Sequence, residues 1–206
     1  MSKGTDLNIR VVSNLSKTQQ VLMYQEDIQT NVKNFKVAAW EHPYIAPKSH
    51  FDVVLPMAIS IAATDEIGRG CLTTKALNVD YNTAWEIFDN NGAIDVRSYD
   101  GSKPTENTIE VYNNCESTKS SVVTKDGKPL FACEVRPEFK VNFAIHPKLY
   151  IALSDMEIHE EFFDAATLSR KPEIIDYEGQ QYVTITLDED VSTGKVTITY
   201  SFDKFI

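Results

Sequence analysis

The sequence predicts an all-β protein made of two tandem, diverged β-sandwich-like repeats packed together, with one short helix in the second repeat. Three observations predict this fold. β-branched and aromatic residues alternate with polar ones over short runs, turn-forming residues separate these runs, and similar segments occur in the same order in both halves. At 206 residues the chain is long enough to bury the cores of two such units.

Two β-hairpins give the clearest strand signals. Residues 182–187 and 195–202 each place aliphatic and aromatic side chains on one face, and turn formers separate the two runs. In the first half, residues 84–88 and 93–98 flank a loop that contains Asn91 and Gly92, the dipeptide typical of a tight hairpin turn. Each half therefore ends in a predicted hairpin.

The two halves match at four places in the same order. The matched pairs are 9–14 with 109–114, 51–54 with 139–142, 59–65 with 149–155, and Asp80-Tyr81 with Asp176-Tyr177. We therefore predict a duplication, with repeat one at residues 1–102 and repeat two at residues 103–206. The polar segment 98–107, which contains Gly101 and Pro104, is typical of a linker. Either each repeat closes its own sandwich, or the two interlock into one larger sandwich.

One segment departs from the strand pattern and predicts the short helix. It begins at Ser154, whose spacing to Glu157 is that of a capping box, and Pro172 ends it. Apolar residues recur at helical spacing at Ile158, Phe162 and Ala166.

The halves differ most at residues 25–50 in the first half and at residues 156–171 in the second. The matched strands are explained by folding alone. A functional site is therefore expected at one of these two departures, because loops that vary on a common scaffold carry function.

The first departure contains the candidate ligand-binding residues Trp40, His42, Tyr44 and His50. They lie in an eleven-residue segment with two prolines, and a stiff loop with aromatic rings suits a sugar or a protein partner. Alternatively, Trp40 belongs to a core strand and only Tyr44 is exposed.

The second departure contains a candidate metal site. On a helix, Glu157, Glu160, Glu161 and Asp164 share one face, and their carboxylates would suit calcium, the one cofactor that the sequence indicates. The alternative is a solvated face opposite the apolar residues of the same helix.

Charge and hydropathy exclude several classes of partner. The formal net charge of −10 would repel a phosphate backbone, so no nucleic-acid partner is expected. No window approaches the ~20 apolar residues of a transmembrane helix, and the N-terminus has no signal-peptide pattern. A cytoplasmic location is expected, with release by another route left open.

Nucleotide-binding, hydrolase and zinc-protease motifs are missing from the sequence. The leading hypothesis is a non-catalytic binding or assembly protein, whose partner is a protein, a carbohydrate or a second copy in a homo-oligomer. One alternative is a toxin or other membrane-acting β protein that inserts the hairpin at residues 182–202. The last is a metal-dependent hydrolase that uses the acidic residues and His159.

Overall fold

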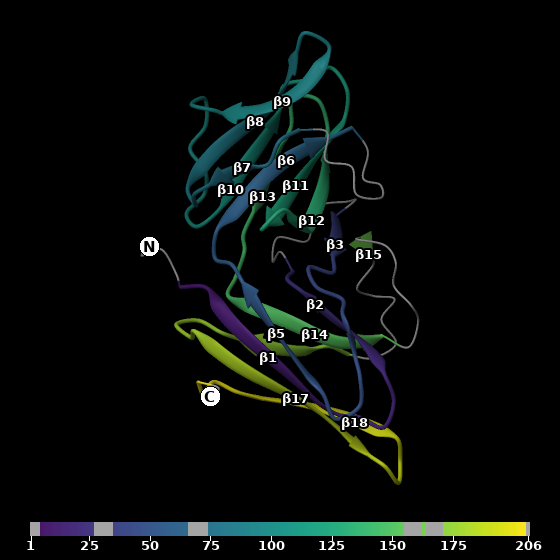
Figure 1. Cartoon of the computed structure of the whole chain (residues 1–206). Helices are drawn as coiled ribbons and strands as arrows, with labels where there is room; N and C mark the ends of the chain where they lie inside the picture. The colour runs from purple at the N-terminus through teal and green to yellow at the C-terminus, as the bar shows by residue number, and fades with distance from the viewer. Residues whose placement is uncertain (1–4, 27–34, 66–73, 155–161, 164–170, 205–206) are drawn as a thin grey trace.

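The computed structural model describes residues 5–26, 35–65, 74–154, 162–163 and 171–204. Within these residues every regular element is a β-strand, so the all-β prediction is confirmed. The strands form four sheets, which lie in two layered units, one above the other in Figure 1. No helix in the described part is long and apolar enough to cross a membrane.

Sheets A and B form the lower unit. Sheet A has the strand order β18-β17-β1-β5, and sheet B has the order β16-β14-β2-β4. Their bounds are β18 (Lys195–Ser201), β17 (Tyr182–Asp190), β1 (Leu7–Asn14), β5 (His50–Leu55), β16 (Glu173–Asp176), β14 (Lys148–Ser154), β2 (Gln19–Tyr24) and β4 (Tyr44–Ile45).

Sheets C and D form the upper unit. Sheet C has the order β13-β10-β8-β9, and sheet D has the order β15-β3-β12-β11-β6-β7. Their bounds are β13 (Lys140–Phe143), β10 (Ile109–Asn113), β8 (Thr83–Asn90), β9 (Ala93–Ser98), β15 (Phe162–Phe163), β3 (Phe35–Ala38), β12 (Lys128–Val135), β11 (Lys119–Lys125), β6 (Ile59–Thr64) and β7 (Leu77–Val79).

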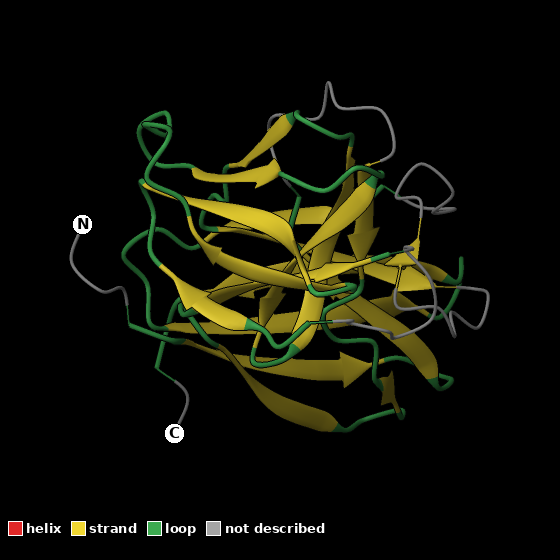
Figure 2. Ribbon diagram, turned by 90° about the horizontal axis from the view of Figure 1, so that it is seen from above, coloured by secondary structure: helices red, strands yellow, loops and turns green. Residues whose placement is uncertain are grey.

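Strands in which apolar and polar residues alternate supply the core between the sheets. The inward residues Ile9 and Ile185 of sheet A belong to the same apolar cluster as Met23 and Ile151 of sheet B. In the upper unit, the ring of Phe131 on β12 lies 5.4 Å from that of Phe143 on β13, which joins sheet D to sheet C. This packing confirms the β-sandwich-like units. In Figure 2 the described part of the chain consists of strands and loops.

Each unit takes strands from both halves of the chain. β3 and β15 join sheet D from between strands of the lower unit, and after β5 the chain passes through Pro56 and builds β6 to β13 in the upper unit. It then returns after β13 through residues 144–147, which include Pro147 (Figure 1). Consequently, hairpin β8–β9 pairs with β10, and the matching hairpin β17–β18 pairs with β1.

The two exchanged pairings have the same register. Val11 faces Ile185 in sheet A, and Val111 faces Trp85 in sheet C, so the residue numbers differ by 100 on both strands. This agreement supports the predicted duplication, which stays a prediction, as does its boundary at residues 102 and 103. In space, the predicted linker at residues 98–107 joins β9 to β10 within sheet C.

Two local expectations have different outcomes. Both predicted hairpins are present, and Asn91 and Gly92 have φ angles of 57° and 90°, as their turn requires. The predicted helix is corrected at Phe162 and Phe163, which form β15 because the free edge of β3 offers them backbone partners. Of the rest of that helix, residues 155–161 and 164–170 lie outside the described residues.

Candidate functional site

The structure separates the four ligand-binding residues predicted from the sequence. Trp40 is buried, with 3% of its surface exposed, and Lys128 lies 5.6 Å above its ring and pairs with Glu41. Trp40 therefore takes the core position that was the alternative prediction.

The other three predicted residues lie on the edges of two different sheets. His42 and Tyr44 are exposed at the β4 edge of sheet B, where Gln20 donates a hydrogen bond of 3.3 Å to the His42 carbonyl oxygen. His50 is exposed at the start of β5, the edge strand of sheet A. The structure does not gather these residues around one point, and their role in binding stays a prediction.

The predicted metal site lies outside the described residues, because Glu157, Glu160, Glu161 and Asp164 all do. Within the ranges that the structure describes, no group of three His, Cys, Asp or Glu residues is placed to hold a metal ion.

The two predicted departures from the predicted repeat meet in space. β3 belongs to the first departure and β15 to the second, and they pair through Phe162 with Ala38 and Phe163 with Val37. In Figure 1 this pair lies beside the region between the upper and lower units. Its side chains pack against the outer face of sheet B.

Strand β2 explains why this contact forms. All six of its residues are buried, because both of its faces are covered. Val21 and Met23 point into the main core, whereas Leu22 and Tyr24 join a second, smaller apolar cluster. A strand buried on both sides has a continuous apolar run instead of alternation, as in the run from Val21 to Tyr24.

Three rings and one carboxyl group lie together on this second cluster. Tyr24 and Tyr150 are cross-strand partners, and their rings stack at 5.2 Å between centroids with an interplanar angle of 22°. The ring of Phe163 meets that of Tyr24 at 5.2 Å and at 89°. Glu26 follows β2 and shares a hydrogen bond with Tyr150. We call Tyr24, Glu26, Tyr150 and Phe163 the aromatic corner.

The aromatic corner has a buried floor and a partly exposed rim. Tyr24 is fully buried, and its hydroxyl oxygen has no hydrogen-bond partner among the described residues. Glu26, Tyr150 and Phe163 are each partly exposed. A molecule that reaches the rim would thus meet two rings and a carboxyl group.

Burial shifts the pKa values of the ionisable groups in the aromatic corner. It raises the pKa of Glu26, and the hydrogen bond from Tyr150 opposes this effect. Burial also raises the pKa of Tyr24 and that of Tyr150, and the nearby charge of Glu26 adds to both. Both phenols therefore stay protonated at neutral pH and can donate hydrogen bonds.

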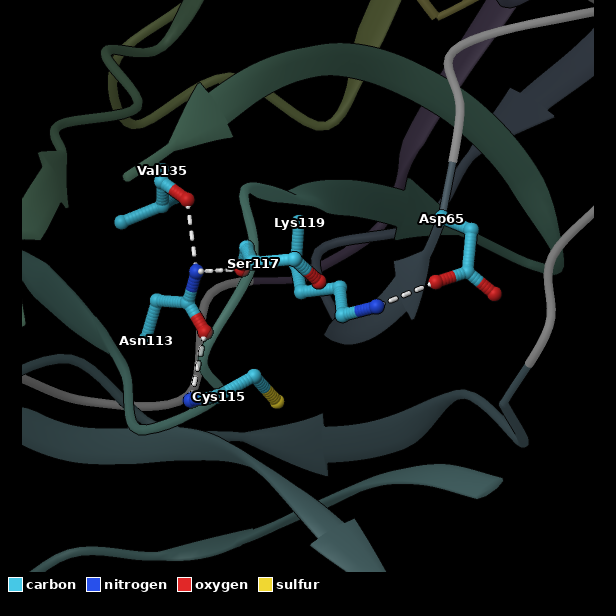
Figure 3. A network of polar contacts seen from close by, with 6 residues as sticks. All are labelled: Asp65, Asn113, Cys115, Ser117, Lys119 and Val135. Carbon is cyan, nitrogen blue, oxygen red and sulfur yellow. Dashed lines mark hydrogen bonds and ion pairs between the residues drawn. The ribbon is translucent and has the colours of Figure 1, made fainter. Parts of the chain in front are cut away.

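A second polar cluster surrounds Cys115 and serves the fold. Figure 3 shows the Asn113 side chain, which donates to the carbonyl oxygens of Ser117 at 2.9 Å and Val135 at 2.7 Å. The side-chain oxygen of Asn113 accepts a hydrogen bond of 2.9 Å from the Cys115 amide, and Lys119 pairs with Asp65 nearby.

Burial raises the pKa of the Cys115 thiol, which keeps the thiol protonated and weakly nucleophilic. Cys115 and Cys133 are both buried free thiols.

The sequence predicted where the corner lies better than which residues form it. Residues 25–50 and 156–171 include Glu26 and Phe163, but Tyr24 and Tyr150 lie on strands that the repeat already explained. The overlooked signal was the unbroken apolar run in β2, which indicated a second buried face.

A comparison with protein-family models finds one described as RhiA, which matches residues 4–200. No curated protein matches the chain.

Proposed function

The chain belongs to the RhiA family, and from the geometry described above we propose that it is a non-catalytic binding protein whose ligand binds at the aromatic corner. The observation that carries this proposal is the fully buried Tyr24 hydroxyl, which has no partner in the described part of the chain and lies beneath a rim of polar and aromatic groups. An unpaired buried hydroxyl costs about 1–3 kcal/mol, and a ligand with a polar group would offset that cost.

Binding is favoured over catalysis by the protonation states. The two tyrosines have raised pKa values and therefore act as hydrogen-bond donors instead of nucleophiles at neutral pH. Aromatic rings with one polar group are typical of sites for small molecules and sugars. A carbohydrate remains one candidate ligand.

A panel of sugars, small aromatic compounds and amines tests the proposal by thermal shift and by saturation-transfer NMR. We expect at least one member to bind, and Tyr24→Phe and Phe163→Ala to weaken its binding. Tyr24→Phe keeps the ring and removes only the unpaired hydroxyl, so the free protein should fold as before.

Tyr44→Ala is the matched control, because Tyr44 is 53% exposed and lies at a different edge of sheet B. Loss of binding in Tyr44→Ala with full binding in Tyr24→Phe would move the site to the segment predicted from the sequence. If no member of the panel binds, the proposal fails.

Self-association is a second candidate function, favoured by the edge of sheet A. Among the described strands, β18 pairs only with β17, and Lys195 is its one charged residue. Long edge strands with few charges are templates for pairing with another chain. A second copy could extend sheet A through β18.

Light scattering coupled to size-exclusion chromatography over a concentration series measures this association. Thr199→Lys should abolish a dimer, whereas Val54→Lys, at the exposed opposite edge of the same sheet, should leave it intact. A monomer at every concentration, or equal effects of the two variants, would exclude pairing through β18.

A further inference from the structure

Among the described residues, no cationic side chain pairs with the carboxyl group of the aromatic corner. Glu26 lies beside the rings of Tyr24 and Tyr150, and it accepts a side-chain hydrogen bond from Tyr150. No Lys, Arg or His pairs with it in the ranges that the structure describes, although Asp52, Asp65, Glu41, Glu86 and Glu110 all have such partners. Within the part of the chain that the structure describes, Glu26 is therefore a partly buried carboxyl group without a cationic partner.

The three rings add to this negative potential. The face of an aromatic ring attracts a cation, and this attraction grows when water is excluded. Tyr150 stacks on Tyr24 and Phe163 is perpendicular to Tyr24, so the ring planes of Tyr150 and Phe163 have different orientations around the buried Tyr24. Carboxylate and ring faces together would attract a cation and repel an anion.

The polar groups of the corner select among cations. A primary ammonium group brings three N–H donors, each of which needs an acceptor after it leaves water. The corner offers the two oxygens of one carboxyl group and two phenol oxygens, but Glu26 and the Tyr150 hydroxyl already bond to each other and the Tyr24 hydroxyl is buried beneath them. A quaternary ammonium has no N–H group, and its methyl groups pack directly on rings.

From this arrangement we infer that the aromatic corner binds a quaternary ammonium group, with Glu26 as the counter-charge and Tyr150 and Phe163 as walls. This inference rests on the proposed function and names its ligand class. The unpaired Tyr24 hydroxyl would bond to a polar group that the ligand carries next to its ammonium.

The test compares choline with 3,3-dimethylbutan-1-ol, which has the same shape and hydroxyl group but no charge. Titration followed by NMR or calorimetry gives both dissociation constants. We expect choline to bind roughly tenfold tighter or more, the size that a cation–π contact and a carboxylate supply at a partly desolvated site.

Two variants assign the effect to the corner. Glu26→Gln should weaken choline about tenfold and leave the neutral compound unchanged, because the substitution removes charge and keeps size. Phe163→Ala should weaken both, since both pack on the ring. Asp52→Asn, which removes an exposed carboxylate on sheet A, should change neither constant.

The outcomes separate the ligand class from the function. Equal binding of choline and the neutral compound, or an unchanged choline constant in Glu26→Gln, overturns the cation inference and leaves a binding site at the corner. Binding of a sugar or aromatic compound without choline also overturns it. Failure of every compound, including the earlier panel, overturns the proposed function itself.

Discussion

The side-chain amide of Gln25 donates a hydrogen bond of 2.9 Å to the hydroxyl of Tyr177, which is 152 residues away in sequence. The same nitrogen lies 3.2 Å from the His146 carbonyl oxygen and 3.1 Å from that of Lys148. These carbonyls belong to the segment that returns the chain from β13 to β14. One buried side chain at the end of β2 therefore fixes the path between the two units.

Replacing Gln25 by Leu should destabilise the protein by about 2 kcal/mol, because it leaves buried acceptors without a donor. Urea denaturation followed by circular dichroism measures this change. Gln181→Leu is the control, since Gln181 is exposed, and it should change stability by less than about 0.5 kcal/mol. Equal effects of the two substitutions would contradict the role of Gln25.

Lys125 is as deeply buried as Gln25, with 1% of its surface exposed, at the end of β11. Burial lowers its pKa from 10.5 to about 8, and the charge of Asp6 opposes this effect. Between pH 8 and 10.5 the unfolded chain therefore binds more protons at this position than the folded one. Stability should rise with pH across this window, and the cost of burying the charge is fully present below pH 8.

Replacing Lys125 by Met should remove that rise and stabilise the protein at pH 7, by up to about 3 kcal/mol. Free energies of unfolding at pH 7, 8 and 9.5 measure the effect. Lys103→Met, at an exposed position, should leave the pH dependence as it is. A variant at Lys125 that keeps the wild-type slope would show that another group causes it.

Asn113, shown in Figure 3, uses its whole side chain to join β10 to the end of β12. Asn113→Ala should cost about 3 kcal/mol, because two carbonyl oxygens and one amide lose their partner in a buried place. Thermal and urea denaturation measure the loss. Ser117→Ala should be nearly neutral, since only its backbone carbonyl takes part; a similar loss in both variants would refute this account.

Gly101 lies against the ring of Tyr99, which stacks on Tyr112 at 5.3 Å and 11°. A Cβ atom at Gly101 would lie 2.5 Å from Cζ of Tyr99, so alanine must displace the ring. We expect Gly101→Ala to cost about 1 kcal/mol in the wild type and close to nothing in a Tyr99→Ala background. A double-mutant cycle measures this coupling, and additive effects would show that the contact with the Tyr99 ring does not cause the loss.

The local pattern predicted most of the strands. Alternation in residues 182–187 and the Asn91-Gly92 turn were sufficient for the hairpins, because side-chain period and turn geometry depend on neighbours in sequence. The matching of segments between the two halves also predicted that matched strands occupy equivalent positions in their sheets. Segments 59–65 and 149–155 hold equivalent places, since Ala62 faces Val122 in sheet D and Ala152 faces Leu22 in sheet B.

The candidate site was predictable only in part. The two departures from the repeat were evident in the sequence, and Phe163 and Glu26 lie within them. The sequence did not indicate that Val37 of one departure would pair with Phe163 of the other, because strand pairing over 126 residues depends on the whole fold. For the same reason Trp40 could be assigned either to a loop or to the core until its neighbours were known.

The sequence by itself determined that both halves of the chain form β-strands, with a hairpin near the end of each half. Only the tertiary structure decided which hairpin completes which sheet. Both hairpins present the same apolar face in the same register, so β1 could pair with either one by local criteria. The crossings at Pro56 and Pro147, and the buried contacts of Gln25, favour the exchanged arrangement, because in sequence order the chain changes units ahead of each hairpin.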